Sequence, residues 1–392
     1  MSKFTKLLKN PKLFFKDALI KKEKIVINKT IDSYNYNIFY PYTHLIHSGE
    51  NVSGLSHINL WIPYFEKANI QFIILVRDYE FFLLLKDTYP YKTILLAKNK
   101  KDIDNYFKQL SYVKACFYPS NTGNNLHLLQ YDNIKHIFIG HGDSDKSASA
   151  HKYFRIYDEN WVAGDAHIDR FKNASFDFLG LKHIKVGRPN LKDVLTISRL
   201  DWKKRFNGKI NLLYLSTWEG VYEEQNYTSV EIMKKVFNTI PMKVDTISIK
   251  LHPWIGKRDN SLLNTQKELE TILRQKNVEF NIFDKNKAIN SLVKESNIFI
   301  CDISAVITDS LAADAPIFVY IPKDKDIKLS QSKMGYKDYT YIFSTADELL
   351  QKMVKVLNGD DYLKKNRKEA MEYILGSDET ISNKFIEKLQ QI

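Results

Sequence analysis

The chain has few cysteines and no pattern that would pair them. Cys116 and Cys301 are the two cysteines in 392 residues, and neither belongs to a CxxC pair or to a spacing typical of zinc sites. Both lie within apolar runs, KACFY and IFICDI, which predicts buried thiols in a reducing compartment. A disulfide framework and a cysteine-rich zinc site are therefore excluded.

Long hydrophobic runs are missing as well. No stretch of 18 apolar residues is present, so we expect no membrane-spanning helix. We also expect no signal peptide, because the start of the chain has neither a long apolar segment nor a small-residue cleavage site. Internal repeats and low-complexity tracts are absent. With its length of 392 residues, the chain is typical of a globular protein of two domains.

The motifs of several common enzyme classes do not occur. Without GxGxxG or GxxxxGK[ST], neither the classical dinucleotide fold nor a P-loop is supported. HExxH, paired metal-ligand spacings and GxSxG are also missing, which argues against zinc proteases and against the common serine hydrolases. We therefore expect a site that uses no metal and no cofactor.

Positive charge is concentrated at the start of the chain. The formal net charge is +12, and residues 1–30 hold nine lysines against two acidic residues, a local excess of +7. The remainder is only mildly basic, which argues against nucleic acid as a partner. In residues 1–24 the lysines alternate with leucines and phenylalanines at helical spacing, interrupted by Pro11. This basic amphipathic segment predicts peripheral binding to an anionic membrane surface, at the cytoplasmic face. A surface helix packed on the protein's own domain would show the same pattern.

Short apolar runs alternate with periodic polar–apolar stretches in two successive series. The first series predicts strands at 25–27, 70–76, 92–96, 115–118, 136–139, 175–179 and 183–186. The second series predicts strands at 210–215, 246–251, 278–283, 298–301 and 317–320. Helices are expected between them, for example at 102–110, 228–238, 262–276 and 288–295. Such alternation is typical of parallel sheets that are covered by helices on both faces.

The pattern predicts an α/β protein with two facing Rossmann-like domains. We place an N-terminal domain at 25–195, a C-terminal domain at 196–375 and a final helix at 376–392. The family resemblance given below implies that the first is the acceptor-side domain and the second the nucleotide-donor-binding domain. The boundary falls in the basic stretch SRLDWKKRFNGK. Because open parallel sheets bind ligands beyond the carboxyl ends of their strands, we expect a ligand between the two domains.

Polar segments follow four of the predicted strands. HGDSDK follows HIFIG and contributes His141, Asp143 and Asp145. The segments STW, HP and DISAVITD follow the later strands and contribute Thr217, Trp218, His252, Asp302, Ser304, Ala305 and Asp309. Taken singly, each residue is most simply a helix cap, a turn residue or a core side chain. Their joint position at strand ends favours a phosphate site, because helix N-termini and histidines can hold phosphate groups.

The ordered set HGDSDK, GRPN, STW, LHP and DISAVITD resembles the CDP-glycerol glycerophosphotransferase family, the teichoic acid primases and polymerases. That family shows HGTxxK, GxPRND, a TW segment, LHP or MHP, and DYSSxxxD in the same order. The resemblance covers residues from about 130 to 345 and implies the GT-B architecture of two facing Rossmann-like domains. The chain departs from the family at HGDSDK, at Ala305 in place of a serine, and at Arg188, which stands earlier in its motif.

The resemblance implies a transferase that moves an alditol phosphate, such as glycerol phosphate, from a CDP-activated donor. The acceptor would be a hydroxyl of a cell-surface polymer or of a lipid-linked molecule. His141 would be the general base, and Asp143 or Asp145 would orient its ring. The donor would be held by Arg188, Thr217, Trp218, His252, Asp302, Ser304, Ala305 and Asp309.

Two other functions stay open. A GT-B glycosyltransferase that uses a nucleotide-activated sugar in capsule or lipopolysaccharide synthesis would show the same motifs at the same spacing. A non-catalytic, membrane-associated binding protein would keep the fold without the activity. Release of CMP, CDP or UDP from a panel of donors separates these three functions.

Overall fold

The structure is a computed structural model. It describes residues 41–146, 149–239, 243–276, 278–284, 287–376 and 383–392, together with residues 19, 22, 25–27 and 29. The predicted membrane-associating segment, residues 1–24, therefore lies outside the described residues except at Leu19 and Lys22. None of the helices in the described ranges is long and apolar enough to cross a membrane.

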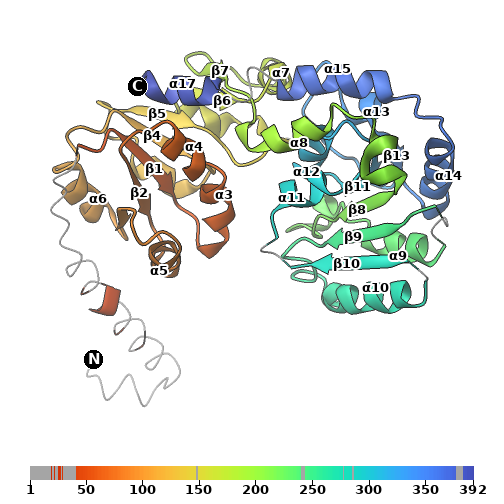
Figure 1. Ribbon diagram of the computed structural model, residues 1–392. Helices are drawn as coiled ribbons and strands as arrows, with labels where there is room; N and C mark the ends of the chain where they lie inside the picture. The colour runs from red at the N-terminus through yellow and green to blue at the C-terminus, as the bar shows by residue number, and fades with distance from the viewer. Residues whose placement is uncertain are drawn as a thin grey trace. The chain divides into compact units, whose positions relative to one another are not determined.

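Contacts divide the chain into two compact units. Unit 1 comprises Met1–Asn59 and Ile70–His136, and unit 2 comprises Leu60–Asn69 and Ile137–Ile392. Each unit is built on parallel strands with helices packed against them (Figure 1). The predicted boundary between residues 195 and 196 stays a prediction.

The first sheet has the strand order β3-β2-β1-β4-β5-β6-β7. Its strands are β1 His44–Ser48, β2 Phe72–Val76, β3 Ile94–Leu96, β4 Ala115–Tyr118, β5 Lys135–Phe138, β6 Glu159–Val162 and β7 Lys182–Lys185. In unit 1, β1 is central: His44 pairs in parallel register with Phe72 on one side and with Ala115 on the other. The chain runs outward through β2 and β3 and then returns to the other side of β1 as β4.

The second sheet repeats this topology, with the order β10-β9-β8-β11-β12-β13. Its strands are β8 Asn211–Leu215, β9 Thr246–Lys250, β10 Glu279–Phe283, β11 Ile298–Asp302, β12 Ile317–Tyr320 and β13 Tyr341–Phe343. Here β8 is central, and it pairs in parallel with β9 on one side and with β11 on the other. The prediction of two Rossmann-like α/β sheets is confirmed.

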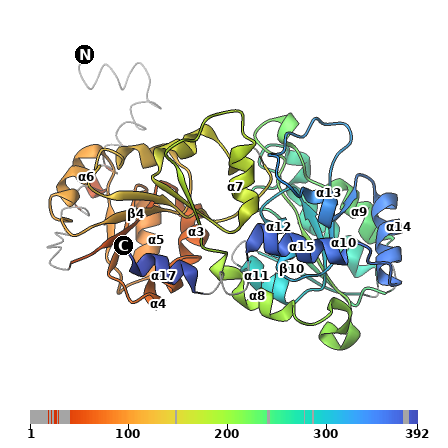
Figure 2. The same cartoon turned by 90° about the horizontal axis from the view of Figure 1, so that it is seen from above.

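Helices of unit 1 are α3 Leu55–Asn59, α5 Tyr79–Thr88 and α6 Lys100–Phe107. Unit 2 contains α4 Ile62–Lys67, α7 Asp165–Lys172, α8 Lys192–Ile197, α9 Val230–Asn238, α10 Thr265–Arg274, α11 Ile289–Lys294, α12 Val306–Leu311, α13 Tyr336–Tyr339, α14 Ala346–Leu357, α15 Lys364–Leu375 and α17 Lys384–Gln390. In the second sheet, α9 packs with α10 and α14, whereas α11 packs with α8 and α12 (Figures 1 and 2). The two groups cover opposite faces, as expected for a parallel sheet.

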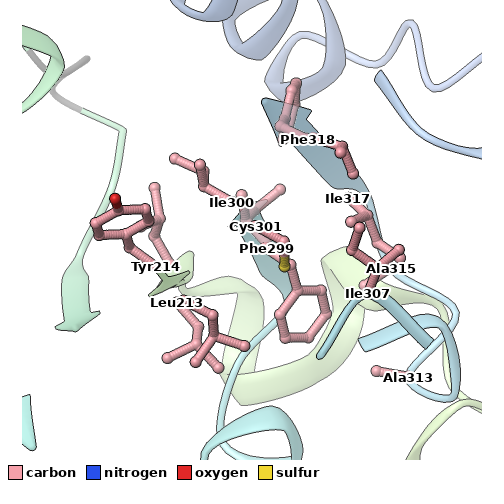
Figure 3. Close-up of a cluster of buried hydrophobic side chains, with 14 of the residues drawn as sticks. Leu213, Tyr214, Phe299, Ile300, Cys301, Ile307, Ala313, Ala315, Ile317 and Phe318 are labelled. Atoms are coloured by element: carbon pink, nitrogen blue, oxygen red, sulfur yellow. The ribbon is translucent and has the colours of Figure 1, made fainter. Parts of the chain in front are cut away.

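The core of unit 2 is formed by near-continuous apolar strands. Leu213 and Tyr214 of β8 lie beside Phe299 and Ile300 of β11, and all four are fully buried (Figure 3). Strands buried on both faces require such runs, which explains why the sequence predicts them well. Both cysteines are buried free thiols, as predicted, and burial raises the pKa of Cys301 to about 12.

Two predicted strands are wrong. Residues 25–27 are helical, and residues 175–179 belong to no strand. In the second case the alternation of SFDFL serves ring packing: Phe176 and Phe178 both contact Phe171, at centroid distances of 6.4 and 6.0 Å. Conversely, β1, β6 and β13 were not predicted, because they are short or carry polar residues at their ends.

Candidate functional site

The second sheet has a topological switch point between β8 and β11. From β8 the chain proceeds to β9 on one side, and it later returns to β11 on the other side. In open α/β sheets the carboxyl ends of such strands form the ligand site. Three of the predicted polar segments follow β8, β9 and β11, so the structure brings them to one edge of one sheet.

The buried carboxylate of Asp302 joins several segments at this edge. It ends β11 and is fully buried, and its Oδ2 accepts a hydrogen bond from the Thr217 amide at 2.8 Å. Its Oδ1 accepts from the amide and the hydroxyl of Ser229, just before α9. Burial raises the pKa of Asp302 to about 7, although these hydrogen bonds oppose the shift. Asp302 thus ties the loop after β8 and the residue before α9 to β11, and the donor-binding role predicted for it stays a prediction.

His252 is held by two backbone hydrogen bonds and by aromatic stacking. Its amide donates to Ser216 Oγ at 3.0 Å, and its Nδ1 accepts from the Trp254 amide at 3.1 Å. The ring stacks on Trp218, with centroids 6.1 Å apart and planes 18° apart. Because Nδ1 is an acceptor, the neutral imidazole carries its proton on Nε2 and can donate from there.

The electrostatic surroundings keep His252 neutral. Burial, followed by the positive charge of Lys146, lowers the pKa of His252 to about 4. At neutral pH the ring is therefore an N–H donor and not a cation. Two lysines act on His252 at this edge: Lys250, which ends β9 and donates to the Asp284 carbonyl, and Lys146, the last residue of HGDSDK. Lys146 has the larger effect. Its pKa is lowered by burial, and the charge of Asp302 opposes that shift.

Lys146 was not among the predicted site residues. The signal was present, because the lysine occupies the final position of the HGTxxK motif that the chain resembles. The structure adds that its Nζ lies 6.0 Å from the centre of the Tyr227 ring.

The HGDSDK loop packs directly against the start of α12. A Cβ on Gly142 would lie 2.8 Å from the Cβ of Ala305, so this position requires glycine and a small residue opposite it. Thr308 Oγ1 donates to the carbonyl oxygen of Asp143 at 2.9 Å. Glycine here allows the loop backbone to approach α12 closely, and Ala305 is its packing partner.

Backbone hydrogen bonds fasten the same loop to the segment before and within α13. The Asp145 amide donates to Tyr336 Oη at 2.9 Å, and the Ser330 amide donates to the Asp145 carbonyl at 2.7 Å. Lys146 forms an antiparallel bridge with Leu329. The loop that carries the predicted base is thus bound to the segment that connects β12 and β13 of the second sheet.

The carboxylates of Asp143 and Asp145 face a buried arginine, Arg170 of α7. Arg170 forms a two-nitrogen ion pair with Asp143, and its Nε lies 3.1 Å from Asp145 Oδ1. Burial raises the pKa of Asp143, but Arg170 and then His167 outweigh it and bring the value to about 2. For Asp145, burial outweighs the attraction of Arg170, so its pKa rises to about 6.

The ion pairs of Arg170 with Asp143 and Asp145 hold the HGDSDK loop from its buried side. Arg170 was not predicted, because it lies 27 residues from Asp143 along the chain and no motif marks it. The proposed role of Asp143 and Asp145 in orienting His141 stays a prediction, since the contacts described above engage both carboxylates with Arg170.

Arg188 brings a second group of predicted residues together. One of its terminal nitrogens donates to the His141 carbonyl at 3.4 Å and lies 3.4 Å from Asp309 Oδ1. Arg188 is buried, whereas the His141 side chain is exposed. Burial raises the pKa of Asp309, and the charge of Arg188 opposes that rise.

Ser304 lies between the residues at the ends of β8, β9 and β11 and the group formed by His141, Arg188 and Asp309. Ser304 Oγ donates to the Asp302 carbonyl at 3.2 Å, and α12 begins two residues later, with Ala305 as its N-cap. The structure thus places Thr217, Trp218, His252, Asp302 and Ser304 at the ends of β8, β9 and β11, and it groups His141, Arg188 and Asp309 beyond Ala305. Within the described ranges, no group of three or more metal-binding side chains gathers.

Comparisons with known proteins match this fold to solved transferase structures. The wall teichoic acid polymerase TagF superposes with a TM-score of 0.59 at 15% identity, over 96% of each chain. A glycosyltransferase from Rickettsia africae ESF-5 has a TM-score of 0.55 at 15% identity, over 91% of this chain and 99% of that one. Anabaena Alr3699/HepE, in complex with UDP and glucose, has a TM-score of 0.53 at 10% identity, over 90% and 100%.

No family model and no curated protein sequence matches the chain. The fold predicted from the motif order is confirmed, because the polymerase, the Rickettsia africae glycosyltransferase and HepE all have it. The identities are low, so the likeness establishes the architecture and leaves the donor and the acceptor to proposal.

Proposed function

We propose that the protein transfers an alditol phosphate from a CDP-linked donor to a hydroxyl of a polymer or a lipid-linked acceptor. The observation that carries the proposal is the set of hydrogen-bond donors at the switch point of the second sheet. Lys146 supplies a charge and His252 an Nε2–H group, and Ser304 would turn its hydroxyl from the Asp302 carbonyl to the ligand. Such groups suit a diphosphate, whose charge must be balanced without water.

Two solved structures of the same fold support a nucleotide-linked ligand for this protein. One TagF structure comes from a soak with CDPG, with a TM-score of 0.58 at 14% identity. The HepE structure contains UDP and glucose. Both structures were thus prepared with a nucleotide or a nucleotide-linked compound. The candidate site of this protein lies at a topological switch point, where open α/β sheets generally bind their ligands.

In the proposed reaction, the acceptor hydroxyl gives its proton to His141. The hydroxyl oxygen attacks the phosphorus that carries the alditol, and the bond to the bridging oxygen of CMP breaks. The electron pair of that bond leaves with CMP, whose negative charge Lys146 and His252 stabilise. Arg188 fixes the base through the His141 carbonyl and reaches Asp309, which we propose holds a donor hydroxyl.

A glycosyltransferase reaction is the second candidate, and the fold shared with the Rickettsia africae glycosyltransferase and with HepE favours it. In that reaction the sugar carbon is attacked and a nucleoside diphosphate leaves. The two functions therefore differ in their product: CMP for alditol phosphate transfer, and CDP or UDP for sugar transfer.

Incubation of the full chain with a panel of CDP-alditols, CDP-sugars and UDP-sugars tests the proposal. We expect CMP to be released from a CDP-alditol in the presence of a hydroxyl-bearing acceptor. Release of UDP or CDP instead would favour the glycosyltransferase. If no nucleotide is released from any donor although the protein binds nucleotides, the function of a non-catalytic binding protein would be favoured.

A further inference from the structure

An exposed tryptophan stands next to the proposed phosphate site. Trp254 follows His252 by two residues in the loop after β9, and 42% of its surface is exposed. Single exposed apolar side chains are common on protein surfaces, so exposure alone decides nothing. Two further observations distinguish Trp254: the loop that carries it is rigidly held, and its ring completes an aromatic corner.

A buried carboxylate holds the loop. Glu219, directly after Trp218, is fully buried, and its two oxygens accept hydrogen bonds from three backbone amides, those of Gly256, Arg258 and Asp259, at 3.2, 2.9 and 3.1 Å. Burial raises the pKa of Glu219, but these hydrogen bonds outweigh it and lower the pKa. Burying a carboxylate is costly, and here the loop's own amides compensate for that cost.

Gly256 makes this loop conformation possible. Its φ is +78°, in the region that favours glycine, and a Cβ there would lie 2.9 Å from the Leu263 amide nitrogen. Together, Glu219 and Gly256 fix the loop in one shape. Trp254 is therefore presented in a set orientation, which lowers the entropy lost when a ligand binds to it.

The three rings form a corner. Trp218 and His252 are nearly parallel, whereas the Trp254 plane lies at 89° to Trp218 and at 76° to His252. One wall of the corner is thus the Trp218–His252 stack, and the other wall is Trp254. Lys257 Nζ lies over one face of the Trp254 ring, 4.6 Å from its centre, and adds a positive charge there.

We propose that Trp254 is the stacking surface for the nucleobase of the donor, while His252, two residues away, binds its phosphate. The inference rests on the proposed function, since it assumes a nucleotide at the switch point. A flat heterocycle gains from stacking on an indole, and Lys257 favours the electron-rich carbonyl of a pyrimidine. The loop after β9 would then supply both the base contact and one phosphate contact.

Calorimetry with CDP, UDP and inorganic pyrophosphate tests this assignment on the full-length protein. Stacking contributes about 1–3 kcal/mol per base, so Trp254→Ala should weaken CDP binding by roughly 5- to 150-fold. Pyrophosphate has no base, and we expect its affinity to stay within twofold. Trp254→Phe keeps an aromatic face and should restore CDP affinity to within a few fold of the wild type.

The matched control is Tyr362→Ala. Tyr362 is another exposed aromatic residue of unit 2, 63% exposed, and it contacts Tyr341 of the edge strand β13. It should leave the affinities for CDP and pyrophosphate unchanged. Thermal unfolding of each variant checks that the loop anchored by Glu219 is intact.

The possible failures are distinguishable. Wild-type CDP affinity in Trp254→Ala would overturn the stacking role alone, as would an equal loss of CDP and pyrophosphate affinity. If the wild-type protein binds neither nucleotide nor pyrophosphate, the proposed function itself is wrong, and the stacking role is wrong with it.

Discussion

The two sheets share one strand order around a central strand but differ in the chemistry at their carboxyl ends. In unit 1, Glu50 follows β1 and pairs with His57 Nδ1 at 2.9 Å, and Arg77 after β2 bonds to His127 Nδ1 at 2.9 Å. In unit 2, β8 and β9 end at Trp218 and His252, and the charge of Lys146 reaches His252.

In both sheets the topology sets where a ligand can bind, and the side chains at that edge determine which ligand binds there. In unit 1, Glu50 repels a diphosphate, and the nitrogens of Arg77 already donate to the Ala97 and Lys98 carbonyls and contact His127. In unit 2, a lysine and a neutral imidazole N–H attract a diphosphate. We therefore assign the nucleotide to the second sheet. The predictions below test that assignment by comparing matched residues of the two units.

The largest expected effect concerns the general base. His141→Ala should reduce transfer by about 10²–10⁴-fold, because the acceptor hydroxyl loses its proton acceptor, while CDP affinity stays within a few fold. His57→Ala, the matched histidine of unit 1, should keep the rate within tenfold. Initial rates of CMP release measure both. A large loss of the CMP release rate in His57→Ala, with full activity in His141→Ala, would show that the general base lies in unit 1.

The next effect concerns phosphate affinity. Lys146→Ala, His252→Ala and Ser304→Ala should each weaken CDP binding by about 1.5–3 kcal/mol, the usual contribution of a hydrogen bond to a charged group. In unit 1, His127→Ala removes an imidazole that is already bonded to Arg77 and should leave CDP affinity unchanged. Calorimetry decides between the two edges, since unchanged affinity in all three unit 2 variants would refute the placement.

A smaller effect is the acid sensitivity that both edges share. Burial lowers the pKa of His47, at the end of β1, to about 3, and that of His252 to about 4. The unfolded chain, with histidines near 6.5, then binds protons first, so stability falls as the pH drops from 6.5 towards 4. Above 6.5 these groups contribute no pH dependence.

Urea unfolding from pH 4.5 to 7.5 measures this slope. His252→Asn should show a shallower loss of stability on acidification than the wild type, because one titrating group is gone. An unchanged slope would show that His252 is not held neutral by its surroundings.

The smallest effect on catalysis is expected from the basic start of the chain. Residues 1–22 carry seven lysines, and we predict that they attach the protein to anionic membranes. Deletion of this segment should abolish sedimentation with anionic vesicles at low salt, yet leave transfer to a short soluble acceptor nearly intact. Loss of that transfer would show instead that the segment belongs to the folded core.

Local pattern predicted much of this fold, and it failed where tertiary contacts decide. Strands with long apolar runs, such as β2 and β8, were predicted, whereas β6, with the sequence ENWV, was not. The polar residues at the strand ends were found because they follow such runs directly. The partners of these residues were not predicted. Arg170 reaches Asp143 from helix α7, and Glu219 accepts hydrogen bonds from amides up to 40 residues away.

A crystal structure of the protein with CDP tests the central claim most directly. The account predicts the diphosphate at the carboxyl ends of β8, β9 and β11, within hydrogen-bonding distance of His252 Nε2 and Ser304 Oγ. A nucleotide bound instead at the end of β1, beside Glu50 and His57, would contradict the assignment of the donor to the second sheet.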